Sequence, residues 1–162
     1  MSFDPWENLL DSKQISDEHF LSLLNDRIFW VDGELLKLNF LKEEEGEAVF
    51  DLIMLIFDSL QLKRKEIKHL VVITNLSQNL VCKAQSHLLG AISRWHSHCG
   101  IANSRFEFFQ NIGFLILLYY LFTIWLEDDS SDLGILMAKT SEALEHWKNL
   151  KRSPLSFMEY FK

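Results

Sequence analysis

The feature that most constrains this chain is the segment from Ile112 to Leu126, which is apolar on every side of a helix. A helix without a polar face must be covered all round, by its own core on one side and by a partner, a ligand or lipid on the other. The segment is shorter than the roughly 20 residues that span a bilayer, and the acidic residues Glu107 and Glu127 limit its extension. The sequence therefore predicts a buried or peripheral helix that contributes to an interface.

The composition predicts that the rest of the chain is helical as well. The 162 residues are 48% hydrophobic and include 13 phenylalanines, but only 6 glycines and 2 prolines. The turn residues that a many-stranded fold requires are therefore scarce. A chain of this length normally forms one domain. We predict an all-α fold, an antiparallel helical bundle over residues 17–152, between a loosely ordered segment at 1–16 and an aromatic tail at 153–162.

The spacing of apolar residues defines the expected helices. Leu36 and Leu38 continue the apolar face of the first element, which we interpret as two short helices or one bent helix with Ser16 as its N-cap. The β-branched run Val71–Thr74 could instead form a strand, but nothing else in the sequence would pair with it, so a helix is preferred. The expected helical ranges are 17–41, 47–61, 63–74, 79–99, 104–128 and 132–152.

Two helix ends carry recognisable capping residues. Gly100 follows the fourth predicted helix and is well placed as its C′ residue, where a left-handed backbone conformation is common. Ser130 or Ser131 is expected to cap the last helix, with Asp132 in its first turn. These signals predict two long antiparallel helices on either side of an acidic turn.

The charge and the cysteines indicate a cytoplasmic protein. The net charge of −7 disfavours a general affinity for nucleic acid, because phosphate binding depends on a surplus of lysine and arginine. The N-terminal residues lack the basic and apolar regions of a signal peptide. Cys82 and Cys99 form no CxxC pair, which suits a reducing compartment.

No motif indicates an enzyme, a metal site or a cofactor. The sequence contains no glycine-rich phosphate loop and no GxSxG elbow. His96 and His98 lie two residues apart on a predicted helix and would point to different sides. Asp128, Asp129 and Asp132 lack the glycine and the distal glutamate of a calcium-binding loop. We therefore expect no catalytic residues and no metal ligands.

Two segments leave a peripheral membrane contact open. The basic cluster at 63–68 is most simply a solvated helix face, with contact to anionic lipid head groups as the alternative. The aromatic tail at 153–162 follows a Ser-Pro pair and is expected to dock on its own body, with a partner or a membrane interface as the alternative.

A resemblance to a known family rests on the order and separation of three features. The segment Glu47–Gln61 resembles the "LFDxxMxRFDxLQ" segment of TetR-family transcriptional regulators, and Trp125–Asp132 resembles their "WLxDDSPD" turn. Trp95 and the corner formed by Cys99, Gly100 and Ile101 also match. The match covers roughly residues 26–151, which is the C-terminal ligand-binding and dimerisation domain of such regulators.

The resemblance implies antiparallel helices that enclose an apolar ligand cavity, with the last two long helices pairing across a two-fold axis into a four-helix bundle. It implies ligand-pocket candidates, with His96 near the pocket mouth: Phe57, Trp95, His96, Phe109, Phe114 and Trp125. It also implies candidates for the interface of a homodimer: Leu118, Phe122, Leu136, Thr140, Leu144 and Trp147.

The region before the match sets the functional expectation. A TetR-type DNA-binding head needs three helices, and the roughly 25 residues that precede the match leave room for one. Lys13 is the only basic residue that precedes Arg27. We therefore expect a non-enzymatic dimerisation and apolar-ligand-binding protein that has lost helix-turn-helix DNA binding. The alternatives are a lipid-binding or isoprenoid-binding accessory protein of ubiquinone (coenzyme Q) biosynthesis, whose body is similar, and a regulator that still binds DNA.

Overall fold

The protein is an all-α helical bundle in the part of the chain that the structure describes. The computed structural model describes residues 13–38, 45–74, 78–101, 107–130 and 132–150, and contains no strand within them. This confirms the predicted fold class. The predictions for residues 1–12, for residues 153–162 and for Ser131 concern positions outside the described residues. The helices of the described residues are α1 (Lys13–Leu35), α2 (Glu45–Gln61), α3 (Arg64–Thr74), α4 (Gln78–His98), α5 (Glu107–Glu127) and α6 (Gly134–Leu150).

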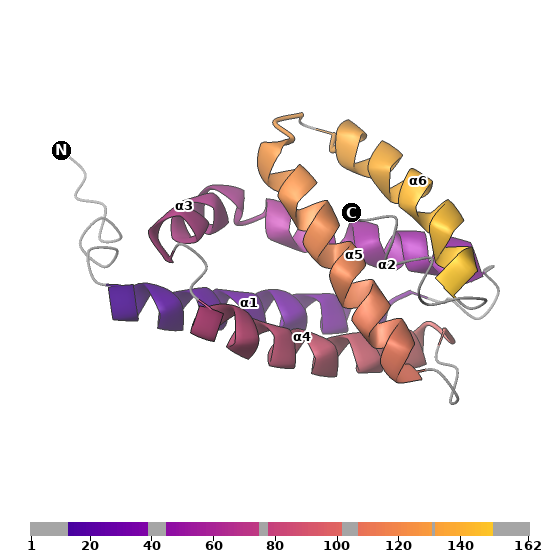
Figure 1. Ribbon diagram of the computed structural model, residues 1–162, viewed down its shortest axis with the longest axis horizontal. Helices are drawn as coiled ribbons and strands as arrows, with labels where there is room; N and C mark the ends of the chain where they lie inside the picture. Colours follow the sequence, from indigo (N-terminus) through magenta and orange to yellow (C-terminus); the bar gives the residue numbers. More distant parts are fainter. Residues whose placement is uncertain (1–12, 39–44, 75–77, 102–106, 131, 151–162) are drawn as a thin grey trace.

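The helices include two close pairs, α1 with α4 and α5 with α6. Helices α1 and α4 lie side by side and run in the same direction, while α5 and α6 run antiparallel (Figure 1). Helix α1 also contacts α2 and α3, and α5 contacts both α4 and α6. The bundle is therefore antiparallel at α5–α6, but its α1–α4 pair is parallel.

Both ends of α1 differ from the prediction. It is one continuous helix that begins at Lys13, so Ser16 lies inside it rather than at its N-cap, because no glycine or proline interrupts the residues just before Ser16. The helix ends at Leu35, and Leu36 and Leu38 are 76% and 46% exposed. The predicted inward position of these two leucines is wrong, since a turn replaces the helix there.

The β-branched run at the end of α3 is helical, as preferred. Leu70 is fully buried whereas Val72 is 77% exposed, and Ile67, one turn before Leu70, is buried. This spacing of buried positions is that of a helix lying on the core with one face. The strand alternative for Val71–Thr74 is excluded.

Gly100 ends α4 in the predicted way. Its φ is +70°, a left-handed conformation that glycine adopts without steric cost. The Ile101 amide donates to the His96 carbonyl at 2.9 Å, and the Gly100 amide donates to the Ser97 carbonyl at 3.3 Å. These two bonds form a Schellman motif, which satisfies carbonyls that the helix end would leave unpaired.

The turn between α5 and α6 is organised by Asp128, which is 1% exposed. Its carboxylate accepts hydrogen bonds from the backbone amides of Ser130 at 2.9 Å and Leu136 at 3.1 Å. Ser130 contributes as well, because its hydroxyl accepts from the Gly134 amide at 3.2 Å. Asp132 precedes α6 instead of lying in its first turn, since the helix begins only at Gly134.

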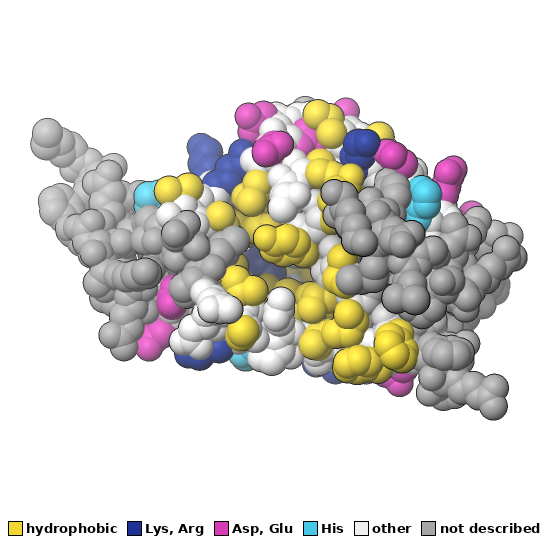
Figure 2. Space-filling model, in the orientation of Figure 1, with side chains coloured by type: hydrophobic (Ala, Val, Ile, Leu, Met, Phe, Trp, Pro, Cys, Tyr) yellow, Lys and Arg dark blue, Asp and Glu magenta, His cyan; other side chains and the backbone are white. Residues whose placement is uncertain are grey.

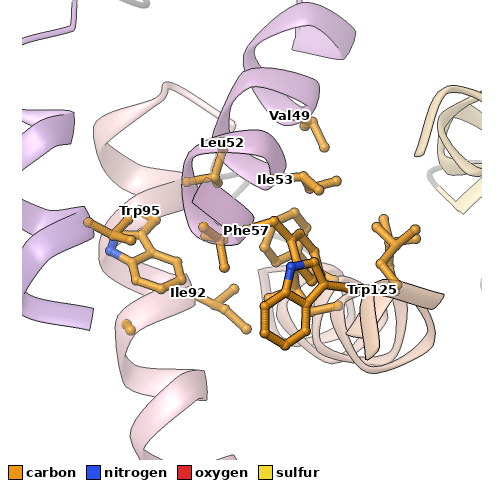
Figure 3. Packing of buried hydrophobic residues seen from close by; sticks show 14 of the residues in the cluster. Val49, Leu52, Ile53, Phe57, Ile92, Trp95 and Trp125 are labelled. Atoms are coloured by element: carbon orange, nitrogen blue, oxygen red, sulfur yellow. The ribbon is translucent and has the colours of Figure 1, made fainter. Parts of the chain in front are cut away.

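The core is centred on α2, which the other helices cover. Val49, Leu52, Ile53 and Phe57 are each at most 1% exposed, and the ring of Phe57 lies beside that of Trp125 of α5, with a centroid distance of 6.4 Å (Figure 3). Each buried side chain of this size contributes roughly 1.5–3 kcal/mol relative to an exposed one. The helix that carries the first family-like motif is therefore the central element of the fold.

Helix α5 extends beyond the apolar segment Ile112–Leu126 at both ends, since it begins at Glu107 and ends at Glu127. Its length and the mean hydropathy of its most apolar 18-residue window, 1.6, meet the requirements for crossing a membrane, while 44% of that window is buried within the protein. The core helix of a soluble protein has the same properties. Tyr119, in the middle of α5, is 61% exposed.

Candidate ligand-binding cavity

An apolar cavity of about 450 Å³ lies between α1, α2, α3, α4 and α5. Figure 2 shows hydrophobic side chains around a hollow in this face of the molecule, with Lys or Arg atoms visible in its depth. The volume lies within the roughly 300–1,000 Å³ that is usual for small-molecule sites. The lining includes Phe20, Leu23, Leu24, Ile28, Val31, Ile56, Phe57, Leu60, Ile67, Leu80, Val81, Ala84, Leu88, Trp95, Leu115, Leu118 and Phe122.

The sequence of α4 explains why the space exists. Leu80, Ala84 and Leu88 are spaced four residues apart and therefore lie on one side of the helix, and all three line the cavity. Ala84 is the smallest of them, and its methyl group leaves room that a leucine would fill. On α1, Leu24 and Ile28 line the opposite wall with the same spacing.

The polar groups of the lining differ in how they are satisfied. The Ser59 hydroxyl donates to the carbonyl of Ile56 at 2.7 Å, within its own helix. The ring of Trp95 lines the cavity, and its Nε1 donates to the Asp32 carboxylate at 2.6 Å. Arg27 reaches only the Ser59 carbonyl, from Nη1 at 3.4 Å, and its buried Nε has no partner.

The structure places only some of the predicted pocket residues in the cavity lining. Phe57 and Trp95 line the cavity. Phe114 and Trp125 are fully buried but lie outside the lining, in the core around α5. Phe109 is 53% exposed near the start of α5, also away from the cavity. The sequence shows that these positions are aromatic, but not which of them pack against neighbouring helices.

His96 differs from its predicted place at a pocket mouth, because it is fully buried and does not line the cavity. Its Nδ1 lies 2.8 Å from Oδ1 of Asn111, and its ring meets Phe114 edge-on at 4.7 Å. Burial lowers the pKa of His96 to about 4, against the opposing effects of the Asn111 hydrogen bond, Glu107 and Glu45. The imidazole is therefore neutral near pH 7.

Trp125 is a structural residue of the α5 end. Its Nε1 donates to Oε1 of Gln61 at 3.0 Å, and its ring stacks on Phe122 at 5.6 Å. The guanidinium of Arg64 lies 4.8 Å from the ring centroid of Trp125, in a cation–π arrangement. These contacts join α2, α3 and α5 behind the cavity.

The predicted dimer residues lie largely inside the single chain. Leu118 and Phe122 line the cavity. On α6, Leu136 and Thr140 are fully buried and Leu144 is 9% exposed, because this stripe packs on α5 and α2. The side chain of Trp147 lies outside the described part of the structure. Among the side chains of α6 that the structure describes, the exposed large apolar ones are Ile135 and Met137, at 57% and 41%.

The remaining chemical candidates are engaged in structural contacts. His98 donates from Nε2 to the Leu35 carbonyl at 2.9 Å, whereas His96 contacts Asn111. Within the described ranges no group of three metal-binding side chains comes together. In the basic cluster, Lys68 pairs with Asp129 at 2.9 Å and Lys63 with Glu66 at 3.3 Å. Arg64 is only 14% exposed, so it is not part of a solvated face.

Arg27 is the charged residue of the described lining, and the sequence analysis did not predict it. It lies four residues from both Leu23 and Val31, which are buried and share its side of α1. A charged residue on the apolar side of an amphipathic helix was the available signal.

No family model, curated protein or solved structure matches this chain, so the TetR resemblance stays a prediction.

Proposed function

We propose that this protein is a non-enzymatic, TetR-like body that binds an apolar small molecule in the cavity between α1 and α5. The observation that carries the proposal is the cavity of about 450 Å³, whose wall is hydrophobic apart from a few polar groups. Sites for small molecules are concave, mostly apolar and largely formed before binding. Burial of a ligand there removes apolar surface of both partners from water.

The role of α1 favours ligand binding over nucleic-acid contact. Phe20, Leu24 and Ile28 place this helix in the cavity wall, and α1 packs on α2, α3 and α4. The helix ahead of α2 thus belongs to the ligand-binding body. The charge of −7 also disfavours contact with phosphates.

A regulatory role would act through α5. Leu115, Leu118 and Phe122 of this helix line the cavity, while its other side packs on α6. Such a role requires two alternative positions of α5. A ligand that binds one of these positions more tightly increases its population. The α5–α6 pair is also where the resemblance implies a homodimer, so ligand and subunit contact would share one helix.

The test of ligand binding uses Nile red, a neutral apolar dye that fluoresces in hydrophobic sites. Ala84→Phe places a ring in the cavity, and Ala138→Phe makes the same change at an exposed position of α6. We expect the wild type and Ala138→Phe to bind the dye with equal affinity and Ala84→Phe to bind it at least tenfold more weakly, on the order of 1.4 kcal/mol. Equal binding by all three proteins would contradict the proposal.

The test of the homodimer is the solution mass by light scattering. Ile135→Glu combined with Met137→Glu places charges on the exposed side of α6 without touching the core. We expect a dimer for the wild type and a folded monomer for this variant. A wild-type monomer at high concentration would remove the dimer from the proposal and leave the cavity.

Mass spectrometry of co-purifying lipids distinguishes an isoprenoid-binding protein from a regulator that binds other ligands.

A further inference from the structure

We propose that the ligand of this cavity is an amphipathic monocarboxylate of the fatty-acid type, whose carboxylate pairs with Arg27 while its apolar part fills the space between α1, α4 and α5. This inference rests on the proposed function and specifies the ligand class. It depends on the position of Arg27, on its unsatisfied donors and on the apolar composition of the surrounding wall.

Arg27 is placed in the cavity by the register of α1. Leu23 and Val31 lie one turn before and after it on the same side, and both are at most 6% exposed. Across the cavity, α4 contributes Leu80 and α5 contributes Leu118 to the lining. The guanidinium therefore lies among hydrophobic side chains of three helices.

The donors of Arg27 are largely unused. A guanidinium carries five N–H donors in a planar fork. The contact to the Ser59 carbonyl, at 3.4 Å, is at the long limit of a hydrogen bond, and Nε is buried without a partner. No carboxylate of the described residues forms an ion pair with this side chain.

The other arginines of the described ranges provide the contrast. Arg94 pairs with Asp32 at 3.0 Å on the surface. Arg64 donates to Gln61, to the Trp125 carbonyl at 2.8 Å and to the Asp128 carbonyl. Each of them has an oxygen partner of its own chain at 3.0 Å or less, whereas Arg27, in the cavity lining, has only the contact of 3.4 Å to the Ser59 carbonyl.

The chemistry of the wall selects the ligand. Among the described lining residues, Arg27 is the one charged side chain, and no Asp or Glu is present to neutralise it. A cation in apolar surroundings is costly unless an anion pairs with it, and the guanidinium fork matches the two oxygens of a carboxylate. One cation matches one negative charge, and the hydrophobic remainder of the wall matches an aliphatic chain.

The test compares decanoate with decanol, which have similar chains but differ in the charge of the head group. Both compete with Nile red for the wild type, for Arg27→Met and for Lys139→Met, which makes the same charge change on α6 outside the cavity. We expect the wild type and Lys139→Met to bind decanoate at least about tenfold more tightly than decanol, and Arg27→Met to lose this preference while it still binds decanol.

The outcomes separate this inference from the function on which it rests. Equal affinity of the wild type for decanoate and decanol would overturn the carboxylate inference, and this result needs no variant to fold. Retained preference in Arg27→Met would also overturn it. If neither compound displaces the dye and the dye itself does not bind, the proposed function fails as well. Arg27→Lys keeps the charge without the fork, and we expect it to keep part of the preference.

Discussion

Two partly buried arginines, Arg64 at the α5–α6 corner and Arg27 in the cavity lining, differ in the acceptors that the chain supplies to them. At the α5–α6 corner, Arg64 covers Trp125, and its donors are used by oxygens of the same chain. In the cavity lining, Arg27 donates one long hydrogen bond, of 3.4 Å, to the Ser59 carbonyl. The chain therefore supplies the acceptors of Arg64 but leaves donors of Arg27 without partners, and this difference is the basis of the proposed carboxylate ligand.

The largest effect is expected from Arg64→Met. This substitution leaves the carbonyls of Trp125 and Asp128 without their donor and removes the cation–π contact. We expect the free energy of unfolding to fall by about 3 kcal/mol, as measured by urea denaturation. Arg94→Met, which removes an exposed pair, is the control and should cost less than about 1 kcal/mol. Equal losses would break the contrast between the corner and the surface.

A pH titration tests a second fully enclosed polar group, His96. Burial lowers its pKa from 6.5 to about 4, so between these values the unfolded chain binds a proton that the folded protein does not. The stability that depends on a neutral His96 is therefore fully present above pH 6.5. The free energy of unfolding falls by about 3 kcal/mol as the pH drops to about 4.

The matched variant for this titration is His96→Gln, which keeps a hydrogen-bonding group beside Asn111 and cannot titrate. We expect the pH dependence of its unfolding, measured by urea denaturation across the same window, to be flatter than that of the wild type. An identical slope in the variant would assign the acid sensitivity to other groups.

A smaller effect is expected from Asp128→Asn. The change keeps one acceptor oxygen for the Leu136 amide and removes the negative charge beside Arg64. Burial acts to raise the pKa of Asp128, but hydrogen bonds from Ser130 and Leu136 and the charge of Arg64 lower it overall. We expect a loss of about 1 kcal/mol near pH 7, which disappears as the pH falls through the lowered pKa. A loss that persists in acid would contradict a role for the charge.

The smallest effect is expected from Arg27→Met in the ligand-free protein. The chain provides this arginine with one hydrogen bond of 3.4 Å, so its removal costs little contact energy. The methionine side chain suits the apolar wall, and we expect a change in the free energy of unfolding of less than about 1 kcal/mol, in either direction. A loss as large as that of Arg64→Met would abolish the distinction between the two arginines.

The local features of the fold could be predicted from the sequence. Helices α2 and α4 begin and end within two residues of the expected ranges, because apolar periodicity is a property of neighbouring residues. Gly100 ends α4 as predicted, since the capping bonds are formed within the same turn. The all-α class followed from the same local patterns and from the scarcity of turn residues.

The site could be predicted only in part. Phe57 and Trp95 line the cavity, but Arg27 was missed and His96 is part of the core. An aromatic position on an apolar face has the same periodicity whether it borders a cavity or a neighbouring helix. The distinction depends on side-chain sizes across the interface, such as that of Ala84 opposite α1.

The sequence by itself determined that this chain is helical, where its long helices lie and that α5 is the most apolar of them. Only the tertiary structure decided what covers each face. It placed Leu136 and Thr140 against the chain's own α2 and α5, and Leu118 in a cavity wall. Hydrophobicity has no direction and is satisfied by any apolar neighbour, so the identity of that neighbour is set by how the helices pack and not by the pattern along one of them.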